Sequence, residues 1–155
     1  MSYIVRGLEP EPFKDLVGLT DEQLAAQNIR RVVASSKPGF PCRVTLEDAE
    51  PGESLLLLNY VSNDAPTPYR TAYAIYVRER AEIRSEYVDE LPPALRGRPL
   101  SLRAFDRNGM LHDATLGADE EADAKIRELL GRDEIASVHA HNAAYGCFAA
   151  KFERN

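Results

Sequence analysis

The chain has 155 residues, of which 44% are hydrophobic and 28% charged, the composition of a folded globular protein rather than a disordered one. Its formal net charge of −6 repels the phosphates of nucleic acids and anionic lipids, so neither nucleic acid nor a membrane surface is an expected partner. The longest apolar run, residues 55–58, is too short to span a bilayer, and no secretory leader pattern opens the chain. We therefore expect a single soluble domain over residues 1–155, located in the cytoplasm.

The first half of the chain predicts short strands and two short helices between turns. Apolar residues at helical spacing predict one helix within residues 9–18, which Gly18 is placed to end. Thr20 and Gln23 have the spacing of a capping box and predict a second helix to about residue 27. Strands are expected at residues 2–7, 30–35, 54–60 and 70–79. The nearly continuous apolar run in the third of these predicts a central strand covered on both faces.

The second half contains the strongest turn signal of the sequence. Asn108 and Gly109 join two strand-like runs within residues 100–116, which predicts a hairpin. Residues 119–130 predict a helix, because acidic residues crowd its first turn and apolar residues form one stripe. Two last strands are expected at residues 135–142 and 147–154.

These elements define the expected fold class. About eight strands and about three helices, with tight turns between neighbouring strands, predict an α+β domain with a mostly antiparallel or mixed sheet.

The stretch VHAHNAAYGCF, residues 138–148, places two histidines before a turn and a cysteine after it. If a five-residue loop joins strands at 137–141 and 147–151, His141 lies opposite Cys147, and His139 lies opposite Ala149. That register gathers the apolar residues on one face. We therefore expect the two histidines and Cys147 together on the more polar face.

Three interpretations of this cluster remain open. Imidazole and thiolate are zinc ligands, so His139, His141 and Cys147 are a candidate site for zinc or another transition metal. Alternatively, Cys147 is a catalytic nucleophile and His141 its base. The third interpretation is packing, in which half-exposed histidines form local hydrogen bonds and the cysteine fills space. Neither CxxC nor HExxH spacing is present, so the pattern does not decide among them.

Candidate residues also lie upstream of this stretch. Cys42 is far from Cys147 in sequence, and both are expected to be reduced thiols in a cytoplasmic protein. Arg70, at the entry of a strand, is suited to clamp a carboxylate or phosphate, or to pair with one of the 25 acidic residues at the surface. No phosphate-binding glycine motif, nucleophile elbow or EF-hand loop is present, which disfavours nucleotide-dependent enzymes and ordinary serine hydrolases.

Four segments together resemble an uncharacterised bacterial family, domain of unknown function 1203. They are KPGFPCRVTLEDAEPGESLLLLNY, PYR, LRAFDRNGM and VHAHNAAYGCFAA, in that order along most of the chain. The resemblance implies a bacterial protein with a one-domain fold and no known reaction. It draws attention to Cys42, Arg43, Tyr69, Arg70, His139, His141, Asn142, Gly146 and Cys147. Tyr73 stands where the resemblance implies a smaller or more polar residue.

Two functional hypotheses follow. The first is a pocket for a small molecule, an anion or a metal, built on the strand pair of His139, His141 and Cys147, whose catalytic form would use Cys147 and His141. The candidate ligand-binding residues are Arg43, Tyr69, Arg70 and Asn142. The alternative is a non-catalytic interaction or homodimerisation module, in which the strand at residues 71–78 offers its edge to another chain.

Overall fold

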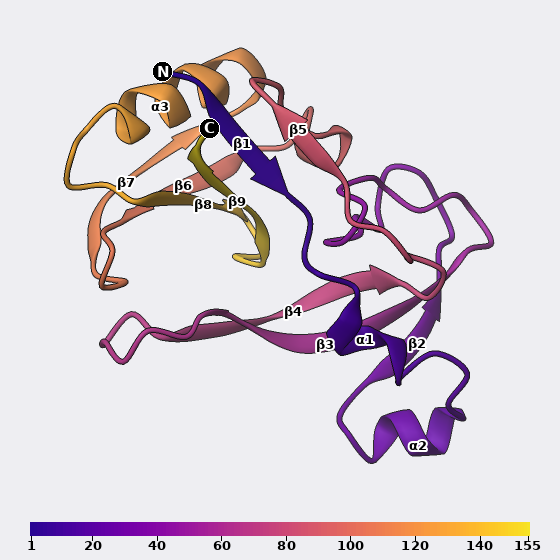
Figure 1. The fold of residues 1–155 in the computed structure, drawn as a ribbon. Coiled ribbons are helices and arrows are strands. Elements are labelled where there is room, and N and C mark those ends of the chain that lie inside the picture. The colour runs from indigo at the N-terminus through magenta and orange to yellow at the C-terminus, as the bar shows by residue number, and fades with distance from the viewer.

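The computed structural model describes residues 1–155 and contains two antiparallel sheets, three α-helices and one short 3₁₀-helix (Figure 1). The elements in chain order are β1 (Tyr3–Arg6), α1 (Glu11–Lys14), α2 (Asp21–Ala25), β2 (Arg30–Val33), β3 (Ser54–Asn63), β4 (Thr71–Arg78), β5 (Glu86–Val88), η1 (Pro93–Leu95), β6 (Leu100–Phe105), β7 (Leu111–Gly117), α3 (Asp119–Leu130), β8 (Ser137–Asn142) and β9 (Phe148–Arg154). The predicted α+β class is confirmed. The strand that the sequence did not predict is the short β5. No helix is both long enough and apolar enough to cross a bilayer.

The larger sheet has six strands in the order β5-β1-β9-β8-β6-β7. Because β1 pairs with β9, the first and last strands of the chain lie side by side within this sheet. α3 covers one face, on the side turned away from β3 and β4 (Figure 1). The apolar stripe of α3 belongs to the same buried cluster as Val138, Ala140 and Phe152. The helix predicted over residues 119–130 is confirmed at both ends, as its acidic first turn and apolar stripe indicate.

The smaller sheet has the order β2-β3-β4, so the apolar run in residues 54–60 is its central strand, as predicted. Leu56 and Leu58 are buried in a cluster with Phe13 of α1 and Leu24 of α2. Leu55 is buried in a separate cluster on the opposite face. This end of β3 is therefore covered on both sides. The predicted capping box at the start of α2 is also present.

Aromatic side chains connect the two sheets. Tyr60 of β3 and Tyr73 of β4 are directly opposed. The ring centroids of Tyr60 and Phe148 are 5.8 Å apart, and those of Tyr73 and His141 are 4.9 Å apart. Both faces of the six-stranded sheet are thus covered at its centre, and the molecule has three layers: α3, the larger sheet and the smaller sheet (Figure 1).

The β8–β9 hairpin contradicts the predicted register. His141 pairs with Phe148 instead of Cys147, and a register shift then pairs His139 with Lys151 instead of the predicted alanine. The prediction assumed that one side of the hairpin is polar and the other apolar. Because the smaller sheet covers the histidine side, an aromatic residue is buried favourably there, and the expected segregation of the two faces does not hold.

The Asn108–Gly109 turn joins β6 to β7, as predicted, and also fastens the two sheets to each other. The Gly109 carbonyl accepts hydrogen bonds from Asn63 Nδ2 and Thr67 Oγ1, both at 3.2 Å. Gly109 has φ of +80°, and a Cβ at this position would lie 2.3 Å from Ala65 Cβ. Glycine is therefore required by both the backbone conformation and the close approach of the β3–β4 loop.

The substitution Gly109→Ala should lower the free energy of unfolding by about 2–4 kcal/mol, because the methyl group meets Ala65 in addition to the left-handed backbone. Gly52→Ala is a matched control, since Gly52 has φ of +91° and no atom within 4 Å of its Cβ position. The control should lose only about 1–2 kcal/mol. Urea unfolding of both variants measures the difference, and equal losses would show that the Gly109 contact does not constrain the sheets.

Candidate functional site

His139 and His141 lie on the face of β8 that the smaller sheet covers, with only 6% and 1% of their surface exposed. The packing interpretation expects half-exposed histidines, whereas both are buried. The ring centroid of His139 is 4.7 Å from that of Phe105 and 5.7 Å from that of Phe148. Its Nδ1 is buried without a hydrogen-bond partner. Burial lowers the pKa of His139 to about 3, so the ring is neutral at pH 7.

His141 is held by the turn that follows it. Its Nδ1 lies 3.0 Å from the carbonyl oxygen of Gly146. Because a carbonyl only accepts, the neutral ring carries its proton on Nδ1, and Nε2 keeps a free lone pair. Burial is the main cause that lowers the pKa of His141 to about 4, and the nearby guanidinium groups of Arg103 and Arg43 act in the same direction.

Cys147 is a partly exposed free thiol in the turn between β8 and β9. The turn is closed by hydrogen bonds from the Asn142 N–H to the Cys147 carbonyl and from the Gly146 N–H to the Asn142 carbonyl. The Nδ1 of His141 is bonded to the Gly146 carbonyl, and no hydrogen bond joins the ring to the Cys147 thiol, so the roles of nucleophile and base stay predictions. No three or more His, Cys, Asp or Glu side chains form a group that could hold a metal ion.

Arg43 is a buried cation, 3% exposed, without a carboxylate partner. Its Nε donates to the Phe148 carbonyl at 2.8 Å, and its Nη1 donates to the Pro41 carbonyl at 2.5 Å. The first of these bonds joins the loop before β3 to the start of β9, and the second lies within that loop. Burial lowers the pKa of Arg43 to about 10, while the nearby Cys147 and Cys42 act in the opposite direction. The guanidinium is therefore still charged at pH 7.

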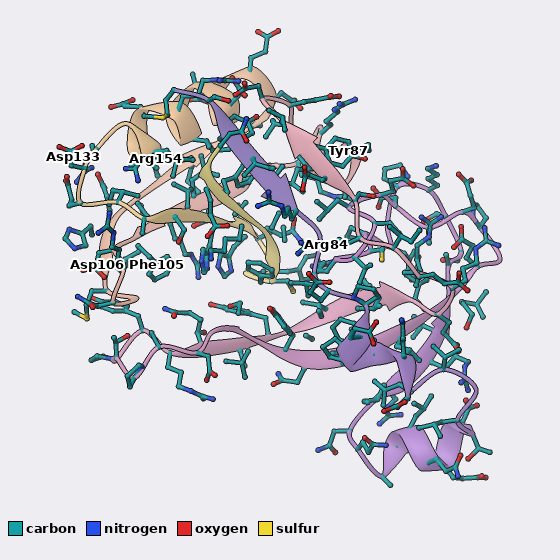
Figure 2. The ribbon with its side chains drawn as sticks, in the orientation of Figure 1. Arg84, Tyr87, Phe105, Asp106, Asp133 and Arg154 are labelled. Carbon is teal, nitrogen blue, oxygen red and sulfur yellow. The ribbon has the colours of Figure 1, made fainter.

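A cleft of about 290 Å³ opens between the β3–β4 hairpin and the β6–β7 hairpin, and we call it the inter-sheet cleft. Its lining residues are Pro68, Tyr69, Arg70, Thr71, Tyr73, Arg103, Phe105, Leu111 and Ala114. Figure 2 labels Phe105 at the end of β6, above the gap between the larger sheet and the β3–β4 hairpin.

Arg103 is the polar residue that connects the two sides of the inter-sheet cleft. Its Nη1 donates to Tyr73 Oη at 2.9 Å, and its Nε donates to Ser101 Oγ at 3.2 Å. These are its hydrogen bonds, and neither partner is a carboxylate. Hydrogen bonding with Thr71, and secondarily with Arg103, lowers the pKa of Tyr73 from the ordinary value of a tyrosine. The cleft therefore contains a guanidinium whose charge no acidic side chain neutralises.

The structure divides the predicted ligand-binding residues between two places. Tyr69 and Arg70 lie at the inter-sheet cleft, where Arg70 pairs with exposed Asp64 at 2.9 Å. Arg43 and Asn142 lie together in a separate small gap. The predicted set therefore does not form one site, although Arg43 and the cleft residue Arg103 both act on the pKa of His141.

Sequence reasoning missed Arg103, Thr71, Phe105 and Leu111 as residues of the candidate site. Strand alternation in residues 100–105 does place Arg103 on the face away from Leu102 and Ala104. The alternation does not indicate that a second sheet covers that face, so the sequence predicts an ordinary exposed arginine at position 103.

The family model described as "Protein of unknown function (DUF1203)" matches residues 39–154. The chain belongs to this family. The DUF1203 match begins after β2 and ends with the last residue of β9, so it includes every residue of the inter-sheet cleft. No curated protein and no solved structure matches the chain.

The two buried histidines predict that this DUF1203 protein loses stability in mild acid. Both titrate near pH 6.5 in the unfolded chain, but their pKa values are about 3 and about 4 in the fold. Between these pH values the unfolded chain binds more protons than the folded chain. The free energy of unfolding therefore has its full value above about pH 6.5 and decreases as the pH falls toward the folded pKa values. From about pH 7.5 to about pH 5.5, each histidine should cost about 1.3 kcal/mol of unfolding free energy.

Chemical denaturation at the two pH values measures this loss. His139→Leu removes one of the two buried groups and should halve the drop. A drop of the same size in His139→Leu would contradict the assignment.

Proposed function

We propose that this protein binds a small anionic molecule in the inter-sheet cleft, through carboxylate or phosphate oxygens. The observation that carries the proposal is Arg103, a partly buried guanidinium in a cleft, bonded to two hydroxyl groups and to no carboxylate. In a chain with 25 acidic and 19 basic residues, a cation in a cleft without an acidic partner is available to an external anion.

The polar groups around Arg103 are suited to an oxyanion. Tyr73 Oη accepts a hydrogen bond from Arg103, so the phenolic proton is free to be donated elsewhere. Arg70 lies at the rim, where Nε and Nη2 are bonded to Asp64 and its other donors are unused. Arginine forks and hydroxyl donors are the groups that bind carboxylate and phosphate oxygens with the best geometry.

Three larger clefts lack this property, and in the largest, of about 600 Å³, the cation Arg80 lies 3.7 Å from Glu53. In the cleft of about 500 Å³ beside α1, the cations Lys14 and Arg78 are paired with glutamates. In the cleft of about 380 Å³ beside β1, Arg6, Arg84 and Lys151 are paired as well. Figure 2 labels Arg84 at this cleft. Internal ion pairs already neutralise these cations, so an anionic ligand has less to gain there.

The proposal concerns binding in the cytoplasm of a bacterial cell. It assigns no reaction, because the predicted nucleophile Cys147 and base His141 share no hydrogen bond and lie outside the residues that line the cleft. Their catalytic and metal-binding roles stay predictions.

Arg103→Gln should weaken the binding of acetate and of inorganic phosphate by about tenfold or more, because it removes the charge and the fork of donors. Arg107→Gln is the control, since Arg107 lies in the turn of the same hairpin, is exposed and does not line the cleft. Isothermal titration at constant ionic strength measures both. Arg70→Gln, at the exposed rim, should weaken binding by a smaller factor. Because Arg70 is exposed, misfolding would not explain that loss of affinity. Equal affinities in the wild type and Arg103→Gln would refute the proposal.

A second candidate function is homodimerisation through β4, which lies at the edge of the smaller sheet. The Tyr76 carbonyl accepts from the Arg43 N–H, so the even-numbered residues of β4 turn their backbone groups outward. The segment that contains Cys42 covers this edge only near Tyr76 and Arg78. The backbone groups of Ala72 and Ala74 have no strand partner, which leaves a site for strand addition.

Size-exclusion chromatography with light scattering tests this candidate. A dimer should have twice the mass of 17.3 kDa, and Ala74→Pro should convert it to a monomer, because proline removes an outward N–H without breaking the β3–β4 ladder. A wild-type monomer at high concentration would contradict the dimer.

A further inference from the structure

We infer that the ligand of the inter-sheet cleft is a small organic acid, with its carboxylate at Arg103 and Tyr73 and an apolar body against the β6–β7 hairpin. This inference rests on the proposed function and adds the chemical class of the ligand.

The lining of the cleft is divided into a polar end and an apolar wall. On β6 and β7, Arg103 is directly opposed to Ala114, and Phe105 is directly opposed to Leu111. The four residues therefore form one surface, with the cation at one end and two large apolar side chains at the other. Neighbouring residues on one face of a strand are about 6–7 Å apart, so a carboxylate held at Arg103 places an attached group of that length over Phe105 and Leu111.

The charge of the cleft favours a monoanion. Arg103 is its one guanidinium without an acidic partner, because Arg70 is already paired with Asp64. A carboxylate neutralises one cation, whereas a phosphate dianion would bring a second negative charge into a protein whose net charge is already −6. Inorganic phosphate would also leave the exposed part of Leu111 in contact with water, since Phe105 is already buried against His139, and it would gain nothing from burial of apolar surface.

The size of the cleft sets an upper limit on the ligand. A volume of about 290 Å³ lies just below the range, about 300–1,000 Å³, that is usual for small-molecule sites. A simple aromatic or aliphatic acid is of suitable size, but a nucleotide or a coenzyme cannot be enclosed.

The experiment compares acetate, 3-phenylpropanoate and inorganic phosphate as ligands of the full-length protein, by isothermal titration at constant ionic strength. We expect 3-phenylpropanoate to bind about tenfold or more tightly than acetate, because only its ring covers the apolar wall. Phosphate should bind no more tightly than acetate. In Arg103→Gln, the affinity for both carboxylates should fall.

Leu111→Ser is the variant specific to this inference. Leu111 is half-buried on the edge strand β7, so the fold should tolerate the change. The affinity for 3-phenylpropanoate should fall about three- to tenfold, and that for acetate should stay the same. Leu116→Ser is the matched control, since Leu116 lies on the same strand, is 64% exposed and does not line the cleft.

The outcomes separate the two proposals. If acetate and phosphate bind through Arg103 but 3-phenylpropanoate has no advantage, or phosphate binds most tightly, the organic-acid inference is overturned and the proposed anion site stands. If none of the three binds, both proposals are wrong. A phenylpropanoate advantage that persists in Leu111→Ser would also overturn the inference, because the apolar wall would then lie elsewhere.

Discussion

The packing of the smaller sheet across β8 and β9 is the constraint on which the rest of the structure depends. Tyr60 and Tyr73 meet Phe148 and His141 at this contact, so the larger sheet has no solvent-facing side at its centre. Desolvation at this interface keeps His139 and His141 neutral. The same contact leaves a cleft at the end where the β3–β4 and β6–β7 hairpins diverge, and the hydrogen bonds to the Gly109 carbonyl limit how far they separate.

The charges enclosed by this packing are unusual for so acidic a chain. Arg43 and Arg103 both lie close enough to His141 to lower its pKa, and neither is bonded to a carboxylate. A buried cation is costly unless polar groups solvate it. Arg43 meets this requirement with two backbone carbonyls, which are permanent features of the fold. Arg103 has only hydroxyl partners in the structure, so polar groups of the protein solvate its charge less completely than that of Arg43. This difference separates a structural arginine from one that is suited to a ligand.

The sequence predicts the parts of this fold that depend on local interactions. Helix α3, the Asn108–Gly109 hairpin and the capping box of α2 are all stabilised by residues close together in the chain, and all three are confirmed. The β8–β9 register failed because the hydrophobic pattern shows which residues are apolar and not what covers them. The predicted register gathers Phe148 with the other apolar residues on the face away from the histidines, but Phe148 packs against Tyr60 and both histidines. Arg103 was missed for the same reason, since its importance depends on a sheet formed by residues far away in the chain.

The inter-sheet cleft also connects ligand binding to the stability of the layered structure. Arg70, Thr71 and Tyr73 come from the smaller sheet and its loop, whereas Arg103, Phe105 and Leu111 come from the larger sheet. A ligand in the cleft therefore contacts both layers at once, and it binds well only when they are packed together. By linkage, any such ligand stabilises the packing of the sheets to the extent that it prefers the closed arrangement. The Arg103–Tyr73 hydrogen bond already joins the layers without a ligand. The cleft is thus formed before binding, and little of the binding free energy is needed to organise it.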